Sequence, residues 1–477
     1  MNARQRPNVV FLMLDTLSAD CLRMYGGDIR MRNLEEMAGK GTVYDNAIAP
    51  GTYTLTSHVS MFTGKRVREV RSLVKNPVRN HHDSTDPLFL KNKYIKDSEP
   101  TLASQMSYLG YRTSLFSNNP FITPSTGLSN GFAYIRNIFL ENKLKYHKTT
   151  LRIIGNDFLR DNLSRLAYHI SSAIPQDTLD NLYVNLRASL NRKVCRETGA
   201  YLLDQGAGLT NDIVDRYLSG AGSRGHFMFI NYMEAHENYP TNMVTRKEVS
   251  QDRWMYVSGM IGPEDAGILR KAYAKRLEYL DYRIGKLMRI LKENGVLDNA
   301  VVVMASDHGQ AFMEHGQLYH TLFPYNEISH VPLIATRWRD GRQESEGRRI
   351  PGPVSLRSIY GSMLDIGYGR TDRLNGTMLG NGTVFSDHTG MLDVWDIPLL
   401  RVFRNRSRNA ERLYRTKLKY NTFATALYSG RYKLMHYYGR RGKDELYDLA
   451  SDPRETDNII GKRRDVAHRL LDANKAG

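Results

Sequence analysis

The sequence has few cysteines and no long apolar segment, and both shortages exclude classes of protein. Its 477 residues include two cysteines, Cys21 and Cys195, in unrelated contexts without Cys-x-x-Cys spacing. Neither a disulfide framework nor a thiolate zinc site is therefore expected, and a reducing compartment fits best. No apolar run approaches the length of a membrane-spanning helix, and the polar, basic residues 1–7 leave no room for the apolar part of a signal peptide. We expect a cytoplasmic protein without a transmembrane segment.

The remaining composition is that of a globular protein with a strong positive charge. Apolar residues make up 41% and charged residues 25%, so disordered and fibrous classes are not expected. The length exceeds that of one hydrophobic core, which favours one large domain with a smaller satellite. The formal charge of +17 favours anionic partners: nucleic acid, acidic lipid, anionic polysaccharide or a phosphorylated substrate. Charge alone does not choose among them, and a well-solvated basic surface is the alternative.

Three apolar runs end in polar residues that could carry chemistry. The first, residues 8–14, is followed by Asp15; the second, residues 300–305, by Ser306, Asp307 and His308; the third, residues 227–230, leads to His236. Continuous apolar runs of this length are typical of strands buried on both faces of a parallel sheet. Ligands of open α/β sheets bind at the carboxyl ends of the strands, so the three segments are predicted to converge on one site.

Helical periodicity between these runs predicts a doubly wound, mainly parallel α/β sheet with helices on both faces. The expected helices lie near 100–110, 208–220 and 264–294. Residues 136–205 are basic and rich in Leu, Tyr and Ile at helical spacing, which suggests an inserted helical layer or lid. After about residue 396 the pattern changes to short strands, including 426–429 and 432–437, and a terminal helix at 462–474. We therefore expect a catalytic domain over 1–395, with the insertion at 136–205, and a small α+β subdomain over 396–477.

Each candidate residue also has a purely structural interpretation. Asp15 could cap the next helix. Asp307 and His308 suit a divalent cation that takes oxygen and imidazole donors, but they could equally be a cap and a satisfied histidine. The hydroxyl-rich segment 49–64 leads into an expected helix at 57–62, where the backbone field favours a bound oxyanion, although a Thr/Ser-rich cap would look the same.

The order of these motifs resembles the sulfatase family of the alkaline-phosphatase superfamily. The resemblance rests on segments 7–15, 50–64, 306–309, 314–316 and 331–334, and on further agreement at 101–103, 110–113, 280–285, 430–433 and 445–456. It covers nearly the whole chain except the insertion at 136–205. It implies an alkaline-phosphatase-like α/β core with a small C-terminal α+β subdomain.

The resemblance also implies roles for individual residues. Asp15, Asp307 and His308 are expected metal ligands, and Thr54 occupies the place of the nucleophile that also touches the metal. His236 and His320 match groups that hold anionic oxygens of the substrate or protonate the leaving group. One further residue, His58, stands where sulfatases place the arginine that supports the nucleophile. Glu314 and His315 either shape the edge of the metal site or are structural.

The chain departs from sulfatases at the nucleophile itself. Residues 54–58 read Thr-Leu-Thr-Ser-His and lack the convertible Cys or Ser, the proline and the arginine of the Cys-x-Pro-x-Arg motif, so formylglycine chemistry is not available. In the hydrated aldehyde of formylglycine, a second hydroxyl expels sulfate without attack at sulfur. A threonine sulfate ester has no second hydroxyl, whereas a phosphothreonine can be cleaved by attack at phosphorus beside a metal. In addition, Thr16 replaces a second acid, residues 117–119 read Ser-Asn-Asn where sulfatases have Gly-Lys-Trp-His, and His320 replaces a lysine.

These departures favour phosphate-type esters: phosphodiester, phosphonate or phospho-alcohol transfer on an anionic glycan or lipid. Two-metal phosphatases of the superfamily that the chain resembles hold a second ion with an Asp and a His spaced by four residues, but no acid lies four residues before His236. The resemblance therefore implies one divalent ion, which could be Ca, Mg, Mn or Zn. Two alternatives stay open: a sulfuric ester hydrolase with an unmodified threonine, and a catalytically silent binding protein. Peripheral contact with an anionic membrane surface is compatible with the charge, and nucleic acid is not expected as a partner.

Overall fold

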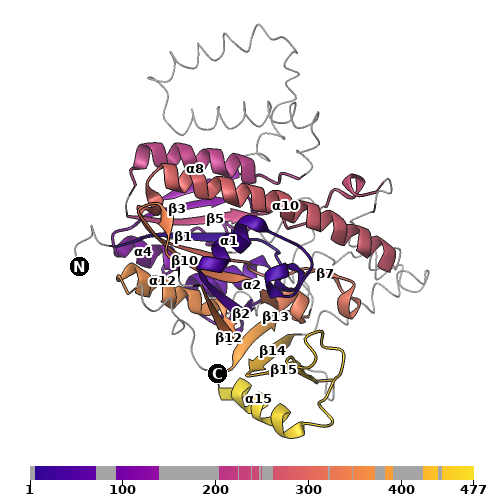
Figure 1. Cartoon of the computed structure of the whole chain (residues 1–477). Coiled ribbons are helices and arrows are strands. Elements are labelled where there is room, and N and C mark those ends of the chain that lie inside the picture. The colour runs from indigo at the N-terminus through magenta and orange to yellow at the C-terminus, as the bar shows by residue number, and fades with distance from the viewer. Residues whose placement is uncertain are drawn as a thin grey trace, which may run out of the picture.

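The computed structural model describes residues 6–70, 93–138, 203–370, 382–389, 423–438 and 443–476, apart from short gaps between 224 and 346. A large sheet and a small sheet organise these residues (Figure 1). The large sheet consists of β1 (Asn8–Leu14), β2 (Thr42–Ile48), β3 (Arg112–Ser117), β4 (Tyr134–Asn137), β5 (His226–Tyr232), β6 (Asn299–Ala305), β9 (His330–Val331), β10 (Leu333–Arg339), β11 (Arg342–Gln343) and β12 (Arg348–Ser355).

The large sheet is mainly parallel, and its central strands carry the predicted site. Its strand order is β12-β2-β10-β6-β1-β5-β3-β4. Strand β1 lies between β6 and β5 and is parallel to both, with Val10 opposite Met228 and Val302. Strand β10 runs antiparallel to both of its neighbours in this order. The carboxyl ends of β6, β1 and β5 therefore lie side by side at one edge of the sheet.

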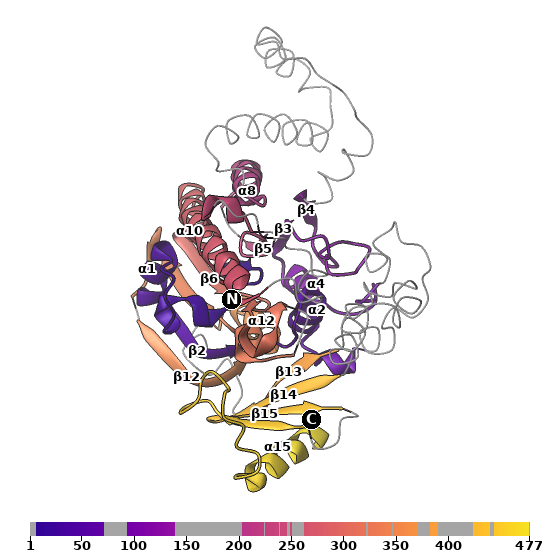
Figure 2. The same cartoon turned by 90° about the vertical axis from the view of Figure 1, so that its right-hand side faces the viewer.

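Helices cover both faces of the large sheet, because successive side chains of a strand point to opposite faces. On one face Val10, Leu12 and Leu14 pack with α1 (Arg32–Lys40), α8 (Ala207–Ala221) and α10 (Pro263–Glu293). On the other face Val9, Phe11 and Met13 pack with α2 (Thr54–Thr63), α4 (Leu102–Tyr108) and α12 (Ile359–Gly367). Figure 2 shows the two helix layers on either side of the strands. The doubly wound fold predicted from the sequence is confirmed.

A four-stranded antiparallel sheet near the C-terminus forms the smaller unit. It consists of β13 (Val384–His388), β14 (Ala424–Ser429), β15 (Tyr432–Tyr437) and β16 (Glu445–Asp448), with α15 (Arg464–Ala476) packed against it. The strand β13 precedes residue 396, where the sequence suggested that the smaller unit begins. The small sheet therefore includes a segment N-terminal to the expected boundary, and we propose that the subdomain starts near residue 384.

A buried ion pair anchors this small sheet to the core. Lys433 Nζ lies 2.5 Å from Glu455 Oε1, and neither side chain is exposed. The other carboxylate oxygen of Glu455 accepts a hydrogen bond from the backbone of Asn326, in the core, at 2.6 Å. Two of the motifs that carry the resemblance therefore meet at the junction between the two sheets.

The helices and strands expected from periodicity agree with the structure to within a few residues. The predicted helices near 208–220 and 264–294 are α8 and α10, and the predicted strands 426–429 and 432–437 are β14 and β15. Most of the expected basic insertion, 136–205, lies outside the described residues. Among the described helices, none combines the length and hydropathy that a membrane crossing requires.

Candidate active site

The ends of two neighbouring strands bring Asp15, Asp307 and His308 together, as the sequence predicted. Asp15 follows β1 directly, and Asp307 and His308 follow β6 after one serine. One ligand-type atom from each of the three lies within 4.8 Å of the others, and all three residues are buried. We refer to Asp15, Asp307 and His308 as the Asp–Asp–His group.

Thr16 holds the two carboxylates of this group in place. Its hydroxyl donates to Asp15 Oδ1 at 2.8 Å, and its backbone N–H donates to Asp307 Oδ1 at 3.2 Å. Both contacts depend on a left-handed backbone at Thr16, with φ of 68°, which is uncommon for a β-branched residue. Conformations of this kind persist where the surroundings over-determine them, and they cluster at functional sites.

The buried negative charge of the Asp–Asp–His group favours the binding of a cation. Burial, together with the negative charge of Asp15, raises the pKa of Asp307 to about 7. Burial lowers the pKa of His308, so its imidazole is neutral near pH 7. Within the described part of the chain, the ion-pair contacts of Asp15 and Asp307 are with His58 and His308. Two buried carboxylates without a lysine or arginine partner are costly unless a metal ion compensates them.

The donor set fits a divalent metal ion. His308 Nδ1 faces the carbonyl oxygen of Gly309 at 3.0 Å, and a backbone carbonyl in that position fixes the tautomer with a free lone pair on Nε2. Among the described residues, His308 Nε2 and Asp307 Oδ2 have no hydrogen-bond partner although they are buried. These two atoms are 3.5 Å apart, close to the separation of about 3–3.5 Å expected for two ligands with bonds of about 2.1 Å to one ion.

Thr54 lies beside the Asp–Asp–His group at the first position of α2. The amide Nδ2 of Asn119 donates to Asp15 Oδ2 at 2.7 Å and also lies 3.3 Å from Thr54 Oγ1. Thr54 is 3% exposed, and the N-cap residue Tyr53 makes no side-chain capping bond to the backbone N–H groups at the start of α2. The predicted nucleophile and predicted metal ligands therefore share one hydrogen-bonded neighbour.

His58 connects the backbone of α2 to the Asp–Asp–His group. Its Nδ1 lies 2.9 Å from the carbonyl oxygen of Thr54 and 3.5 Å from Asp307 Oδ2. The ring is fully buried and packs edge-on against Phe62 and Phe229. His58 therefore contacts both the backbone of Thr54 and the carboxylate of Asp307, and its support of the nucleophile stays a prediction.

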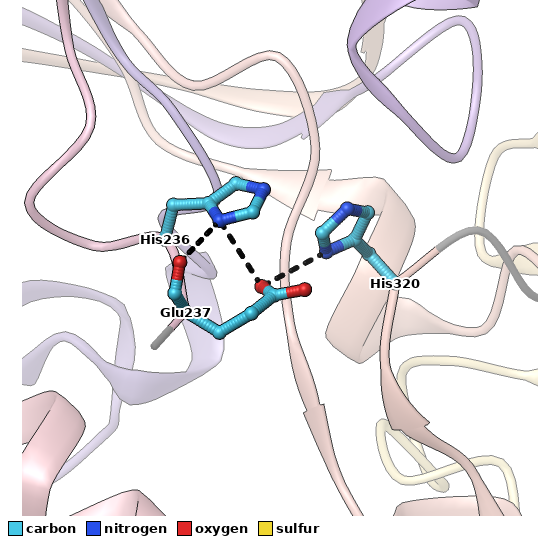
Figure 3. Close-up of side chains that lie close together, drawn as sticks. All are labelled: His236, Glu237 and His320. Carbon is cyan, nitrogen blue, oxygen red and sulfur yellow. Dashed lines mark hydrogen bonds and ion pairs between the residues drawn. The ribbon is translucent and has the colours of Figure 1, made fainter. Parts of the chain in front are cut away.

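His236 and His320 lie together, but around a carboxylate that the sequence analysis had not singled out. Glu237 Oε2 is 3.3 Å from His236 Nδ1 and 3.5 Å from His320 Nδ1, as Figure 3 shows. Gln310 adds hydrogen-bond contacts to Glu237 and to His320 Nδ1. The ring centroid of His320 lies 4.5 Å from that of His308, so this His–Glu–His group borders the Asp–Asp–His group.

The His–Glu–His group of His236, Glu237 and His320 also has the composition of a metal site. Its ligand-type atoms lie within 4.8 Å of one another. No acid lies four residues before His236, whereas the carboxylate of Glu237 belongs to the very next residue. An adjacent His and Glu can be seen in a sequence, but the contact between Glu237 and His320 can be seen only in the folded structure.

Glu314 and His315 lie outside both ligand groups. His315 stacks on Tyr325 at 3.9 Å and contacts Glu327 Oε1 at 2.9 Å and the carbonyl oxygen of Glu455 at 3.2 Å. Burial alone would lower the pKa of His315, but the hydrogen bond and charge of Glu327 outweigh it and raise the pKa to about 9. Of the two roles left open for His315, these contacts favour the structural one, at the junction with the small sheet.

Three asparagine and glutamine residues of the site carried little signal in the sequence. Asn119 follows β3, Asn231 lies near the end of β5, and Gln310 follows the Asp–Asp–His group. Asn231 Nδ2 lies 3.4 Å from Asp15 Oδ2, in addition to the bond from Asn119. Their common signal is a polar residue at the carboxyl end of a central strand, which is where the fold gathers functional groups.

Known proteins with similar sequences and folds are esterases of two kinds. The arylsulfatase of Clostridium perfringens is 20% identical over 95% of this chain and 90% of its own length, and the N-acetylglucosamine-6-O-sulfatase of Bacteroides thetaiotaomicron is 22% identical over 96% and 83%. The solved phosphonate monoester hydrolase of Agrobacterium radiobacter has the same fold, with a TM-score of 0.62 at 17% identity over 99% of this chain and 95% of that one.

The family model for sulfatases matches residues 7–368, which include the Asp–Asp–His group, Thr54 and the His–Glu–His group. The match covers well over half of the chain, and the relatives above span nearly all of it. This chain therefore belongs to the sulfatase family, a family of hydrolases with an alkaline-phosphatase-like fold.

Proposed function

We propose that this chain cleaves or transfers a phosphate-type ester with the hydroxyl of Thr54 as its nucleophile. The observation that carries the proposal is the position of Asn119, whose amide nitrogen contacts both Thr54 Oγ1 and Asp15 Oδ2. This shared amide supports a role for the unmodified Thr54 hydroxyl next to Asp15 of the Asp–Asp–His group.

A divalent ion is the cofactor we propose, held by Asp15, Asp307 and His308 with Thr54 at its edge. When bound, such an ion would withdraw charge from an ester oxygen and lower the pKa of a neighbouring hydroxyl. The donors favour an ion that accepts oxygen and one imidazole, as Ca, Mg, Mn and Zn do to different degrees.

The residues of the chain have separate tasks in the proposed reaction. Asn119 orients the Thr54 hydroxyl, and His58 fixes the first turn of α2 through the Thr54 carbonyl. The Thr54 hydroxyl gives up its proton to solvent and Oγ1 attacks phosphorus in line, so the bond from Oγ1 to phosphorus forms as the bond to the leaving oxygen breaks. His236 or His320 gives a proton to the leaving oxygen or holds the non-bridging oxygens. Water or an acceptor alcohol then attacks phosphorus and restores the Thr54 hydroxyl.

The preference for phosphorus follows from the nucleophile. A hydrated aldehyde can expel sulfate through its second hydroxyl, but threonine has one hydroxyl and offers no such exit. A phosphothreonine ester, in contrast, is open to attack at phosphorus. The likeness in fold to a phosphonate monoester hydrolase is compatible with this chemistry, although at 17% identity it supports the fold alone.

We propose an anionic glycan or a lipid-linked glycan as the substrate class. The net charge of +17 favours an anionic substrate, and one relative bears the name of a sulfatase for a sugar sulfate. The same charge is compatible with transient contact at an anionic membrane surface. A cytoplasmic location stays a prediction from the sequence.

A sulfuric ester hydrolase with an unmodified threonine is the second candidate, because the named sequence relatives are sulfatases. A silent binding protein is less well supported, since the metal-ligand residues and the hydroxyl are all present and Asn119 contacts both the hydroxyl and Asp15.

The test is a panel of nitrophenyl esters assayed with each of the four ions: phosphate monoester, phosphodiester, phosphonate monoester and sulfate. We expect the phosphodiester or phosphonate to be turned over fastest. Matched assays with the Asp307→Asn variant show whether turnover belongs to this site. Much faster turnover of the sulfate ester would leave the family assignment intact and refute the preference for phosphorus. No turnover of any ester by the wild-type protein loaded with each ion would favour the silent alternative.

A further inference from the structure

A pocket between the core and the small sheet contains a buried arginine that is only partly satisfied. The pocket has about 740 Å³ of empty space, including its mouth to solvent. Pro50 and Ser60, from the segment around α2, lie on one side of it, and Val384 and Phe385 of β13 lie on another. It is separate from the Asp–Asp–His and His–Glu–His groups, none of whose residues lines it.

The guanidinium of Arg66 is the unusual feature of this pocket. Its side chain is 4% exposed and lies flat on the ring of Phe385, with Cζ 3.5 Å from the ring centroid. Nη2 is 3.8 Å from Asp387 Oδ1 and donates a long hydrogen bond of 3.5 Å to Asn474 Oδ1. Within the described part of the chain, Nε and Nη1 have no hydrogen-bond partner. Three of the five N–H groups of this arginine are therefore unsatisfied.

Among the described residues that line the pocket, positively charged side chains outnumber negatively charged ones. Arg357 lines the pocket with Arg66, and one buried carboxylate, Asp387, faces them. That carboxylate also accepts a hydrogen bond of 2.7 Å from Thr425, so it is shared. The positive charges of Arg68 and Arg357 add to burial in lowering the pKa of Arg66. A buried cation with unpaired N–H groups and a surplus of positive charge is costly unless an anion compensates it.

We propose that this pocket binds an oxyanion, a phosphate or sulfate group that is either free or part of a small ligand. The planar fork of an arginine matches two oxygens of such a group, and the hydroxyls of Ser358 and Thr383 in the lining could serve the remaining oxygens. Phe385 provides the flat surface that holds the fork in one orientation. A singly charged carboxylate would satisfy fewer of these donors.

The pocket lies at the junction between the small sheet and the core, so a bound anion would affect that junction. The backbone N–H of Asp387 donates to the carbonyl oxygen of Pro50 at 2.9 Å, and Gly51 forms a β-bridge with Asp387. The bound anion would therefore strengthen the junction between the small sheet and the segment that leads into α2. This inference does not depend on the reaction proposed for Thr54.

Selenate, a sulfate analogue, tests the location of the site because selenium scatters anomalously. In crystals of the full chain soaked with selenate, we expect an anomalous peak within hydrogen-bond reach of Arg66 Nε and Nη1. The peak should be absent from crystals of the Arg66→Gln variant. If a soak with an excess of selenate gives a peak at the Asp–Asp–His group and none in the pocket, the proposal is wrong.

Calorimetric titration with inorganic phosphate, inorganic sulfate and acetate tests the chemistry in solution. We expect Arg357→Gln to weaken phosphate or sulfate binding by about tenfold or more, since it removes a charge-assisted contact. The Arg289→Gln variant, which loses the same charge at an exposed position of α10, should bind as the wild type does. This arm stands even if Arg66→Gln fails to fold. Equal affinities for all three proteins, or acetate binding as tight as phosphate binding, would overturn the proposal.

Discussion

Replacing Thr54 by alanine separates a catalytic role from a structural one. The structure predicts a small loss of stability, whereas a catalytic role predicts a large loss of kcat. Thr54 Oγ1 has one long hydrogen-bond contact, at 3.3 Å from Asn119, and the same amide keeps its shorter bond of 2.7 Å to Asp15 when the hydroxyl is removed. The loss of stability should therefore be about 1 kcal/mol or less. Loss of a principal catalytic group, in contrast, should lower kcat by about 10²–10⁴-fold.

The matched control is Thr56→Ala, the same substitution two residues along α2. Thr56 Oγ1 is also buried and donates to the Tyr53 carbonyl oxygen at 2.8 Å, away from the Asp–Asp–His group. We expect this control to lose at least as much stability as Thr54→Ala while its kcat changes by only a few fold. Thermal unfolding and steady-state kinetics on the best ester of the panel measure both quantities for each variant.

A covalent intermediate gives the direct readout. Rapid quench of the wild-type enzyme followed by peptide mass spectrometry should detect phosphate or a phospho-alcohol group on Thr54. The Thr54→Ser variant should keep part of the activity and carry the same group on the new hydroxyl. A Thr54→Ala enzyme with full activity would refute the mechanism and the role that the family resemblance assigns to this position.

Three other predictions concern the surroundings of Thr54. Asn119→Leu should lower kcat/KM by about 10–100-fold, because the charge-assisted bond to Asp15 is lost; unchanged kinetics would contradict its positioning role. Metal analysis should find one divalent ion per chain and none in Asp307→Asn; two ions per chain would instead assign the His–Glu–His group as a second metal site. The pKa of His315 is raised from 6.5 to about 9, so its bond to Glu327 should contribute at most about 3 kcal/mol to the free energy of unfolding below pH 6.5. This contribution should disappear as the pH rises through 9 and the imidazole loses its proton. The unfolding free energies of wild type and His315→Gln should therefore converge above pH 9, and a constant difference would contradict this.

The fold could be predicted because its signals are local. All seven residues of β1 are buried and those after Asn8 are apolar, which is the pattern of a strand buried on both faces, and α10 repeats its apolar residues at helical spacing over 31 residues. Asp15 and Asp307 could be placed at one edge because parallel strands end together. These inferences need only the sequence and the rules of sheet packing.

The remaining features of the site depend on contacts between distant segments. Asn119 and Asp15 are 104 residues apart in the chain, and no periodicity indicates that the amide would bridge Asp15 and Thr54. The contact of Glu237 with His320 likewise joins distant segments, and His320 directly follows Tyr319, which has a left-handed backbone with φ of 67°. A strained tyrosine in that position could not be foreseen from composition or spacing.

The charge of the site also bears on which esters it can accept. Asp15 and Asp307 together would neutralise one divalent ion, and Thr16 ties these two carboxylates together. The ionisable groups described around this neutral centre are His58, His236, His320 and Glu237: no histidine carries the fixed charge of a lysine or arginine, and the Glu237 carboxylate adds a negative charge. Such a site matches an ester with a single negative charge better than a phosphate monoester with two, because the second charge would be left without compensation in a buried setting. Phosphodiesters, phosphonate monoesters and sulfate monoesters are all monoanions, so they share this electrostatic requirement, and the nucleophile rather than the charge must distinguish them.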